Sequence, residues 1–250
     1  MVIAAFYVVA SDVRAESVDD LPGDQEDQVS IVEHLDRRIT ISDNGASAPQ
    51  VVVDGNLTHL FWVDGEEGSQ KLAWKCSNDS LSTFTPDTTL TSNFYSIADI
   101  SLSVSDDRIA ATFEAKVTES SPSTVYLLYS TDGEEWSSAC LVTSGDSPVL
   151  FAGEDGQYLG MNTVIDGDRH LSVISIKWQE NEINATMVAS LPIAADAVDM
   201  IFNDGLIDIA FCYGISSSML FMQLTGNGTV VTSPTMICQV QNAQELECRS

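Results

Sequence analysis

Arginine is the residue type whose placement says most about chemistry in this sequence. Its planar guanidinium can bind a carboxylate through two parallel hydrogen bonds, which a lysine cannot do. The chain has only 10 Lys and Arg among its 250 residues. Arg38, Arg108 and Arg169 lie at or beside the start of strand-like runs. They are the candidate catalytic residues of a site for an acidic ligand. The alternative is that Arg108 and Arg169 are surface partners of neighbouring Asp residues.

Other side chains that could do chemistry show no motif. The 37 Asp and Glu would supply the paired carboxylates of a glycosidase, but so many acids make a converging pair uninformative. The three histidines have no metal-ligand spacing, and the cysteines form no CxxC pair. The cysteines allow one or two disulfides and leave at least one thiol unpaired in a monomer. We expect no metal site and no cofactor. The histidines are His34, His59 and His170, and the cysteines are Cys76, Cys140, Cys212, Cys238 and Cys248.

The excess of acidic residues argues against some classes of binding partner. The formal net charge is −27, which repels the phosphate groups that nucleic-acid-binding proteins contact with Lys and Arg. No stretch reaches the roughly 18 consecutive apolar residues that a membrane-spanning helix needs. We therefore expect no nucleic-acid partner and no membrane span.

Four strand-like runs recur at a constant interval and would position these side chains. They begin at His59, Arg108, Tyr158 and Ile207, which are 49, 50 and 49 residues apart. A tight acidic turn precedes each run, and the runs that follow are short and rich in β-branched and aromatic residues. The turns are Asp54-Gly55, Asp106-Asp107, Asp155-Gly156 and Asp204-Gly205. Asp-Gly is typical of two-residue hairpin turns.

Each interval holds four strand candidates, which is the pattern of a β-propeller blade. The fold class predicted is all-β, a propeller of four-stranded antiparallel blades with about 49 residues per blade. The chain is predicted to form a single domain, residues 1–250. Its blades are approximately 1–42 (partial), 43–95, 96–144, 145–192 and 193–240, with 241–250 as a closing strand.

The ends leave two alternatives open. Ile3–Ala10 resembles the second strand of the other blades, and Val29–His34 and Arg38–Ser42 are further strand candidates. A fifth blade closed by 241–250 would complete a ring. The alternative is that the chain is a piece of a six- or seven-bladed protein. Separately, residues 1–15 are either a blade strand or a signal-peptide remnant.

Two turns between third and fourth strands carry a recognisable motif. Ser77-Asn78-Asp79-Ser80-Leu81-Ser82-Thr83-Phe84 resembles the Asp-box, S-x-D-x-G-x-T-W/F, of the sialidase-like (BNR repeat) propellers, with Leu81 in place of glycine. Ser130-Thr131-Asp132-Gly133-Glu134-Glu135-Trp136 is a second copy, shorter by one residue. The third blade has no copy, and Thr225–Thr229 is at most a remnant. The motif residues are Ser77, Asp79, Phe84, Ser130, Asp132 and Trp136.

The resemblance implies a structural role for these residues. In this family Asp-boxes lie away from the active face, so we expect Asp79 and Asp132 to be buried acceptors of backbone N–H bonds within their turns. The family's enzymes use three arginines, a Tyr nucleophile with a Glu, and an Asp acid/base. Arg38-Ile39 resembles the family's early Arg-Ile-Pro, with Thr40 in place of the proline, and no Tyr or Glu here stands in a distinctive context.

The function expected from these observations is binding or scaffolding. The chain is interpreted as a non-catalytic extracellular or cell-surface module, part of a longer surface protein, with a glycan or protein ligand. The alternative is a glycoside hydrolase of the sialidase type. Four glycosylation sequons favour an exterior location. They lie at Asn56, Asn78, Asn184 and Asn227.

Overall fold

The computed structural model describes residues 45–79, 83–105, 108–154, 156–179, 182–213 and 218–239. These residues form sixteen strands and no helix. The predicted N-terminal strands, the predicted closing strand 241–250 and Arg38 lie outside the described residues.

The strands form four antiparallel sheets of four strands each. The first sheet contains β1 (Ser47–Asp54), β2 (Leu57–Asp64), β3 (Lys71–Ser77) and β4 (Thr88–Thr89). The second contains β5 (Ser96–Ser105), β6 (Arg108–Lys116), β7 (Thr124–Ser130) and β8 (Cys140–Ser144). The third contains β9 (Asp146–Gly153), β10 (Gly156–Ile165), β11 (Asp168–Gln179) and β12 (Glu182–Leu191). The fourth contains β13 (Ala195–Asn203), β14 (Leu206–Tyr213), β15 (Ser218–Thr225) and β16 (Val230–Gln239).

The predicted fold class is confirmed. The four runs spaced by 49 or 50 residues become β2, β6, β10 and β14, each the second strand of its sheet. The sequence pattern predicts the last strand at Met236–Val240, whereas β16 spans Val230–Gln239, which is the largest difference among the strands. Pro234 lies within β16, which is an edge strand, where a proline need not cost a ladder hydrogen bond.

The hairpin turns are close to the predicted ones. Between β13 and β14 the two loop residues are Asp204 and Gly205, with φ of 49° and 80°, as a turn with two left-handed residues requires. Between β1 and β2 the loop is one residue further along than predicted, at Gly55 and Asn56.

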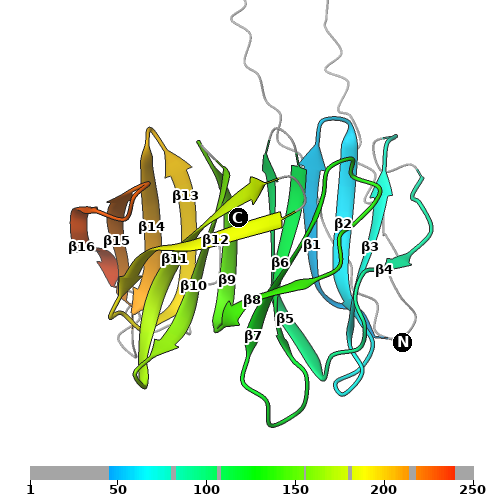
Figure 1. Ribbon diagram of the computed structural model, residues 1–250, viewed down its shortest axis with the longest axis horizontal. Coiled ribbons are helices and arrows are strands. Elements are labelled where there is room, and N and C mark those ends of the chain that lie inside the picture. Colours follow the sequence, from blue (N-terminus) through cyan, green and yellow to red (C-terminus); the bar gives the residue numbers. More distant parts are fainter. Residues whose placement is uncertain are drawn as a thin grey trace, which may run out of the picture.

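The sheets stand side by side in chain order, from β1–β4 at the right of Figure 1 to β13–β16 at the left. The first strands β1, β5, β9 and β13 pack successively against one another, so that they form the inner row. These four strands all run in the same direction, so that they begin at one end of the sheets and finish at the other. We call the end where they begin the channel end and the other the Asp-box end.

The hydrophobic core lies in the three layers between neighbouring sheets. Phe61 and Trp74 of the first sheet pack with Phe113 of the second. Leu127 of the second sheet packs with Leu159 of the third. The third and fourth sheets enclose another cluster, which contains Val173, Ile207, Ile209, Phe211 and Met222. Burial against a neighbouring blade is therefore what holds each sheet in place.

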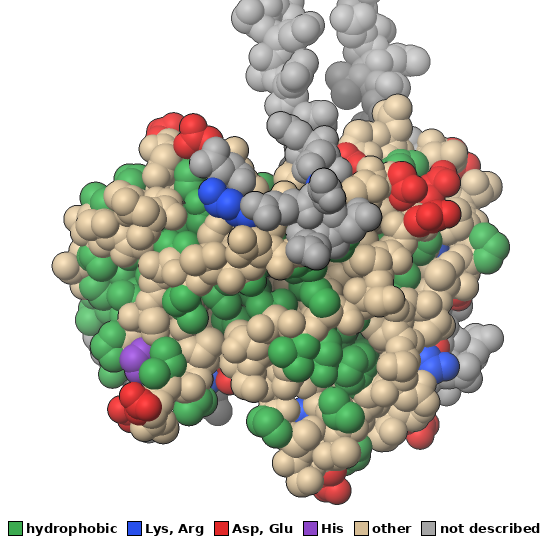
Figure 2. Space-filling model, in the orientation of Figure 1, with side chains coloured by type: hydrophobic (Ala, Val, Ile, Leu, Met, Phe, Trp, Pro, Cys, Tyr) green, Lys and Arg blue, Asp and Glu red, His purple; other side chains and the backbone are tan. Residues whose placement is uncertain are grey.

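Burial patterns follow from this stacking. The central part of β6 is buried on both faces because its sheet has neighbours on both sides, whereas β14 alternates between buried and half-buried residues. The outer strand of the fourth sheet exposes Val231, Met236 and Ile237. Figure 2 shows hydrophobic side chains gathered over this sheet at the left of the molecule.

Candidate functional site

A cleft of about 430 Å³ lies where the four first strands begin, at the channel end. Each first strand contributes residues to its wall, so the cleft sits between all four blades. The lining residues are Ala48, Gln50, Asp99, Ile100, Ser101, Ser147, Pro148, Val149, Asp196, Ala197, Val198 and Asp199. A concave site built by several elements is the usual place for a ligand.

A β-bulge near the start of each first strand shapes the cleft wall. The pairing register shifts between Ser47 and Gln50, between Ala98 and Ser101, opposite Gly160–Asn162 and between Ala195 and Ala197. Ala48, Asp99 and Ser147 occupy the bulges with left-handed φ of 47°, 46° and 54°. Such conformations are costly for residues other than glycine and are found where backbone geometry serves a site.

The cleft is acidic. Asp99, Asp196 and Asp199 are exposed on its wall, and no Lys or Arg is among its lining residues. The wall also offers hydroxyl and amide groups from Ser101, Ser147 and Gln50. Carboxylates and hydroxyl oxygens accept hydrogen bonds, so this wall suits a ligand that donates them.

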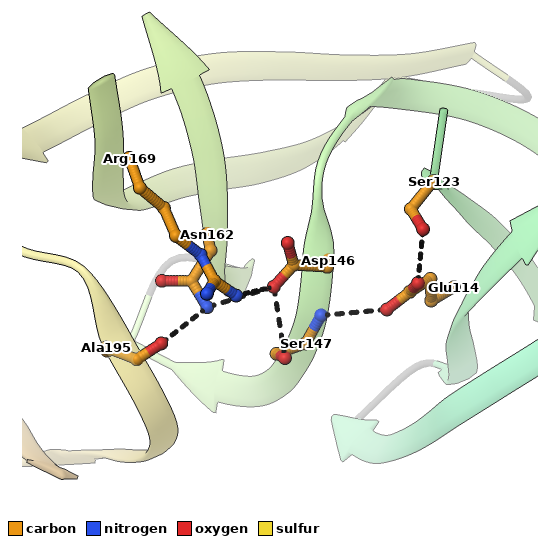
Figure 3. A network of polar contacts seen from close by, with 7 residues as sticks. All are labelled: Glu114, Ser123, Asp146, Ser147, Asn162, Arg169 and Ala195. Atoms are coloured by element: carbon orange, nitrogen blue, oxygen red, sulfur yellow. Dashed lines mark hydrogen bonds and ion pairs between the residues drawn. The ribbon is translucent and has the colours of Figure 1, made fainter. Parts of the chain in front are cut away.

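A polar network adjoins the cleft at Ser147 (Figure 3). One carboxylate oxygen of Asp146, Oδ1, accepts hydrogen bonds from Arg169 Nη2, from Asn162 Nδ2 at 3.1 Å and from the Ser147 hydroxyl at 3.2 Å. On the other side of the bulge, the Ser147 backbone N–H donates to Glu114 Oε2 at 3.3 Å, and the Ser123 hydroxyl donates to Glu114 Oε1.

Asn162 connects the third and fourth blades within this network. It is only 1 % exposed, and its Nδ2 also donates to the carbonyl oxygen of Ala195 at 3.0 Å. Because Nδ2 contacts two acceptors, the amide orientation is fixed. Its Oδ1 is buried without a hydrogen-bond partner among the described residues.

The predicted arginines are not brought together. Arg169 lies at the channel end and pairs with Asp146, which agrees with its interpretation as a partner of a nearby Asp. Arg108 lies at the opposite end, where it pairs in register with Ser105, the last residue of β5. Its guanidinium lies 4.8 Å from the ring centroid of Trp178 and 5.6 Å from that of Tyr129. Arg38 is outside the described residues.

The two Asp-box turns connect third and fourth strands at the end opposite the cleft. Asp79 Oδ1 accepts the backbone N–H of Thr83 at 2.7 Å, and the Ser77 hydroxyl donates to the same oxygen at 2.9 Å. Asp132 Oδ1 accepts the backbone N–H groups of Glu134 and Glu135 at 2.9 and 2.8 Å. Both carboxylates thus close their turns locally.

Burial of these residues differs from the expectation. The carboxylates of Asp79 and Asp132 are exposed, and it is the serines Ser77 and Ser130 that are buried. A short turn at a sheet edge has no layer above it to cover the acid. The N–H groups of Glu135 and Glu134 lower the pKa of Asp132 below its ordinary 3.8.

The aromatic residues of the two motifs are half-buried and pack inward. Trp136 makes edge contacts with Phe61 at 5.1 Å and Trp74 at 5.9 Å between ring centroids, so it fills the layer between the first two blades. Phe84 packs against the small cluster of Leu60, Trp62 and Ala73.

The fourth blade has the same turn with an amide in place of the acid. Asn227 Oδ1 accepts from the hydroxyls of Thr225 and Thr229 and, at 3.4 Å, from the Thr229 backbone N–H. Thr225-x-Asn227 therefore takes the position of Ser77-x-Asp79, which the sequence had indicated only as a remnant.

The remaining candidates are placed as follows. The four sequon asparagines, Asn56, Asn78, Asn184 and Asn227, are all exposed. Cys76, Cys140, Cys212 and Cys238 are free thiols. His170 is half-buried and hydrogen-bonds Ser190 at 3.1 Å, whereas His59 is buried and accepts a hydrogen bond from Trp74 Nε1 at 3.2 Å. Burial lowers the pKa of His59 below its ordinary 6.5.

Sequence reasoning missed the cleft residues. Ala48, Asp99, Ser147 and Asp196 occupy equivalent bulges, and their numbers differ by nearly the blade length. Aligning the blades on their second strands would have placed the four together. The bulges themselves depend on pairing across strands and left no local signal.

Two features are absent from the described residues. No group of three or more His, Cys, Asp or Glu side chains is arranged to hold a metal ion. No helix there is long and apolar enough to span a membrane.

Comparison with known proteins finds similarity in structure but no match in sequence. No family model matches the sequence, and no curated protein matches it either. The structure is similar to a Trypanosoma rangeli sialidase in complex with sialic acid, at 11 % identity and a TM-score of 0.53, over 76 % of this chain and 37 % of the sialidase.

Two other solved structures are similar to the same degree. One is Zg3597, a family 117 glycoside hydrolase of Zobellia galactanivorans, at 8 % identity and a TM-score of 0.51, over 77 % of this chain and 69 % of that one. The other is the polysaccharide lyase Uly1, at 14 % identity and a TM-score of 0.51, over 80 % and 50 %.

The sheets and these likenesses define a β-propeller with a sialidase-like fold. The resemblance inferred from the Asp-boxes is thereby confirmed as a resemblance of fold. The chain spans less than two fifths of the length of the sialidase.

Proposed function

We propose that this chain is a glycan-binding propeller module that acts outside the cell, and that its ligand site is the channel-end cleft. The observation that carries the proposal is the cleft wall, where all four blades present hydrogen-bond acceptors and no cation. Sugar hydroxyls are donors, and carboxylates are their strongest acceptors among neutral-pH side chains.

The charge of the wall selects among glycans. Three aspartates face the cleft, and the whole chain has a formal charge of −27. This field disfavours an anionic sugar and leaves a neutral one unaffected. The ligand class is therefore a neutral oligosaccharide.

Two observations support the carbohydrate and exterior parts of the proposal. Structures of similar fold include proteins named as a sialidase, a glycoside hydrolase and a polysaccharide lyase. All four sequon asparagines are exposed, as acceptors of N-linked glycans must be.

The alternative is a glycosidase of the sialidase type, which the likeness of fold favours. Such an enzyme needs guanidinium groups gathered around a sugar carboxylate. Here Arg169 is paired with Asp146, and Arg108 lies at the Asp-box end. The binding module is therefore the better supported of the two.

A glycan array tests the proposal. The protein should bind neutral oligosaccharides, and Asp196→Ala should weaken that binding roughly tenfold, the equivalent of one charge-assisted hydrogen bond. Glu134→Ala, which removes an equal charge at the Asp-box end, should bind as the wild type does. Equal losses of glycan binding in both variants would overturn the proposal. So would a wild-type protein that binds no neutral oligosaccharide on the array.

A further inference from the structure

We propose that Asp146 fills a carboxylate-binding site of the protein itself and thereby determines which ligands the neighbouring cleft accepts. Three donors from the third blade converge on its Oδ1: the guanidinium of Arg169, the amide of Asn162 and the hydroxyl of Ser147 (Figure 3). A guanidinium, an amide N–H and a hydroxyl are the groups by which proteins bind a ligand carboxylate.

Contacts other than those with Asp146 also help to hold these donors in position. Asn162 is held by the carbonyl of Ala195 at 3.0 Å and is almost fully buried, so its N–H remains directed to the same point. Ser147 is held in its bulge through its own backbone N–H, which Glu114 accepts. The Arg169 backbone pairs with Val164 between β11 and β10, next to the start of β11. Removal of the Asp146 side chain would therefore leave the Asn162 amide and the backbones of Ser147 and Arg169 in place, with the guanidinium within reach of the same point.

The site is also open to solvent. The side chains of Arg169 and Asp146 are 39 % and 32 % exposed, and Ser147 lines the cleft. A small carboxylate can therefore reach the donors once Asp146 no longer occupies them. In the wild type the internal carboxylate neutralises Arg169, so an acidic sugar meets no available guanidinium there. This last step rests on the proposed glycan-binding function, whereas the carboxylate site does not.

Chemical rescue by acetate tests the inference. Asp146→Ala should melt below the wild type in sodium chloride. Replacing the chloride by about 200 mM sodium acetate should raise its melting temperature by about 2–4 °C more than that of the wild type, if acetate binds with a Kd of some tens of millimolar. Should Asp146→Ala fail to fold in chloride, its refolding yield in acetate and the melting of Asp146→Ser give the same readout.

Two matched variants separate binding from a general effect of acetate. Asp146→Asn keeps the space filled and should show no added stabilisation. The double variant Asp146→Ala/Arg169→Gln lacks the guanidinium and should show none either. Equal acetate shifts in all variants, or no shift in Asp146→Ala and Asp146→Ser, would refute the carboxylate site.

A second readout connects the site to ligand choice. On a glycan array, Asp146→Ala should gain binding to uronic-acid-terminated oligosaccharides while it keeps the wild-type neutral ligands. If the wild type binds no glycan, the proposed function fails but the acetate result still decides this inference. If acetate rescues while acidic glycans gain nothing, the carboxylate site stands and its role in specificity is wrong.

Discussion

Asn162→Leu should destabilise the protein, because it removes the side-chain amide that connects the third and fourth blades. Asn162 is 1 % exposed and donates to Asp146 at 3.1 Å and to the Ala195 carbonyl at 3.0 Å. Each lost hydrogen bond costs about 0.5–1.5 kcal/mol net, and a buried acceptor left unpaired costs about 1–3 kcal/mol. The leucine side chain recovers part of this by burial, and loss of Asn162 Oδ1, which is buried without a partner among the described residues, recovers a further part. The expected loss is about 2–4 kcal/mol of the free energy of unfolding.

The assay is thermal or urea unfolding followed by circular dichroism. For a chain of this size the loss corresponds to a fall in melting temperature of about 5–15 °C. Asn184→Ala is the control, because Asn184 is exposed, and it should change the free energy of unfolding by no more than about 0.5 kcal/mol. Equal stabilities for Asn162→Leu and the control would refute the contact between the third and fourth blades.

Two further predictions concern the turns and pH. Asp132→Ala removes the acceptor of two backbone N–H groups, so its melting temperature should fall below that of Glu134→Ala while glycan binding is unchanged; lost binding at an unchanged melting temperature would assign a ligand role to the motif. Burial lowers the pKa of His59 below 6.5, so the folded state prefers the neutral ring and its stability should decrease as pH falls below about 6.5. In urea unfolding between about pH 7 and 5, His59→Phe should lose less stability than the wild type, and equal losses would show that His59 does not titrate there.

The strands could be predicted because their signals are local and repeated. Each run is rich in β-branched and aromatic residues and follows an acidic turn, and the spacing of His59, Arg108, Tyr158 and Ile207 then assigned the runs to equivalent positions. The edge position of β16 could not be seen, because it depends on which strand lies beside it.

The candidate site was harder to predict because its contacts join distant residues. Arg169 meets a carboxylate 23 residues away, and Asn162 meets a carbonyl 33 residues away. The left-handed residues Ala48, Asp99 and Ser147 are left-handed because of bulges in strand pairing, not because of their own preferences. Only the suggestion that Arg169 pairs with an Asp was available beforehand.

Hydrolysis of a fluorogenic sialoside is the measurement that tests most directly whether this propeller binds ligands without sialidase chemistry. Arg169 is paired with Asp146, Arg108 lies at the opposite end, and the cleft presents Asp99, Asp196 and Asp199 to an anionic sugar. We predict no fluorophore release above a heat-denatured control. Release that disappears on substitution of Arg38, Arg108 or Arg169 by alanine would contradict the binding-module account and establish the enzyme in its place.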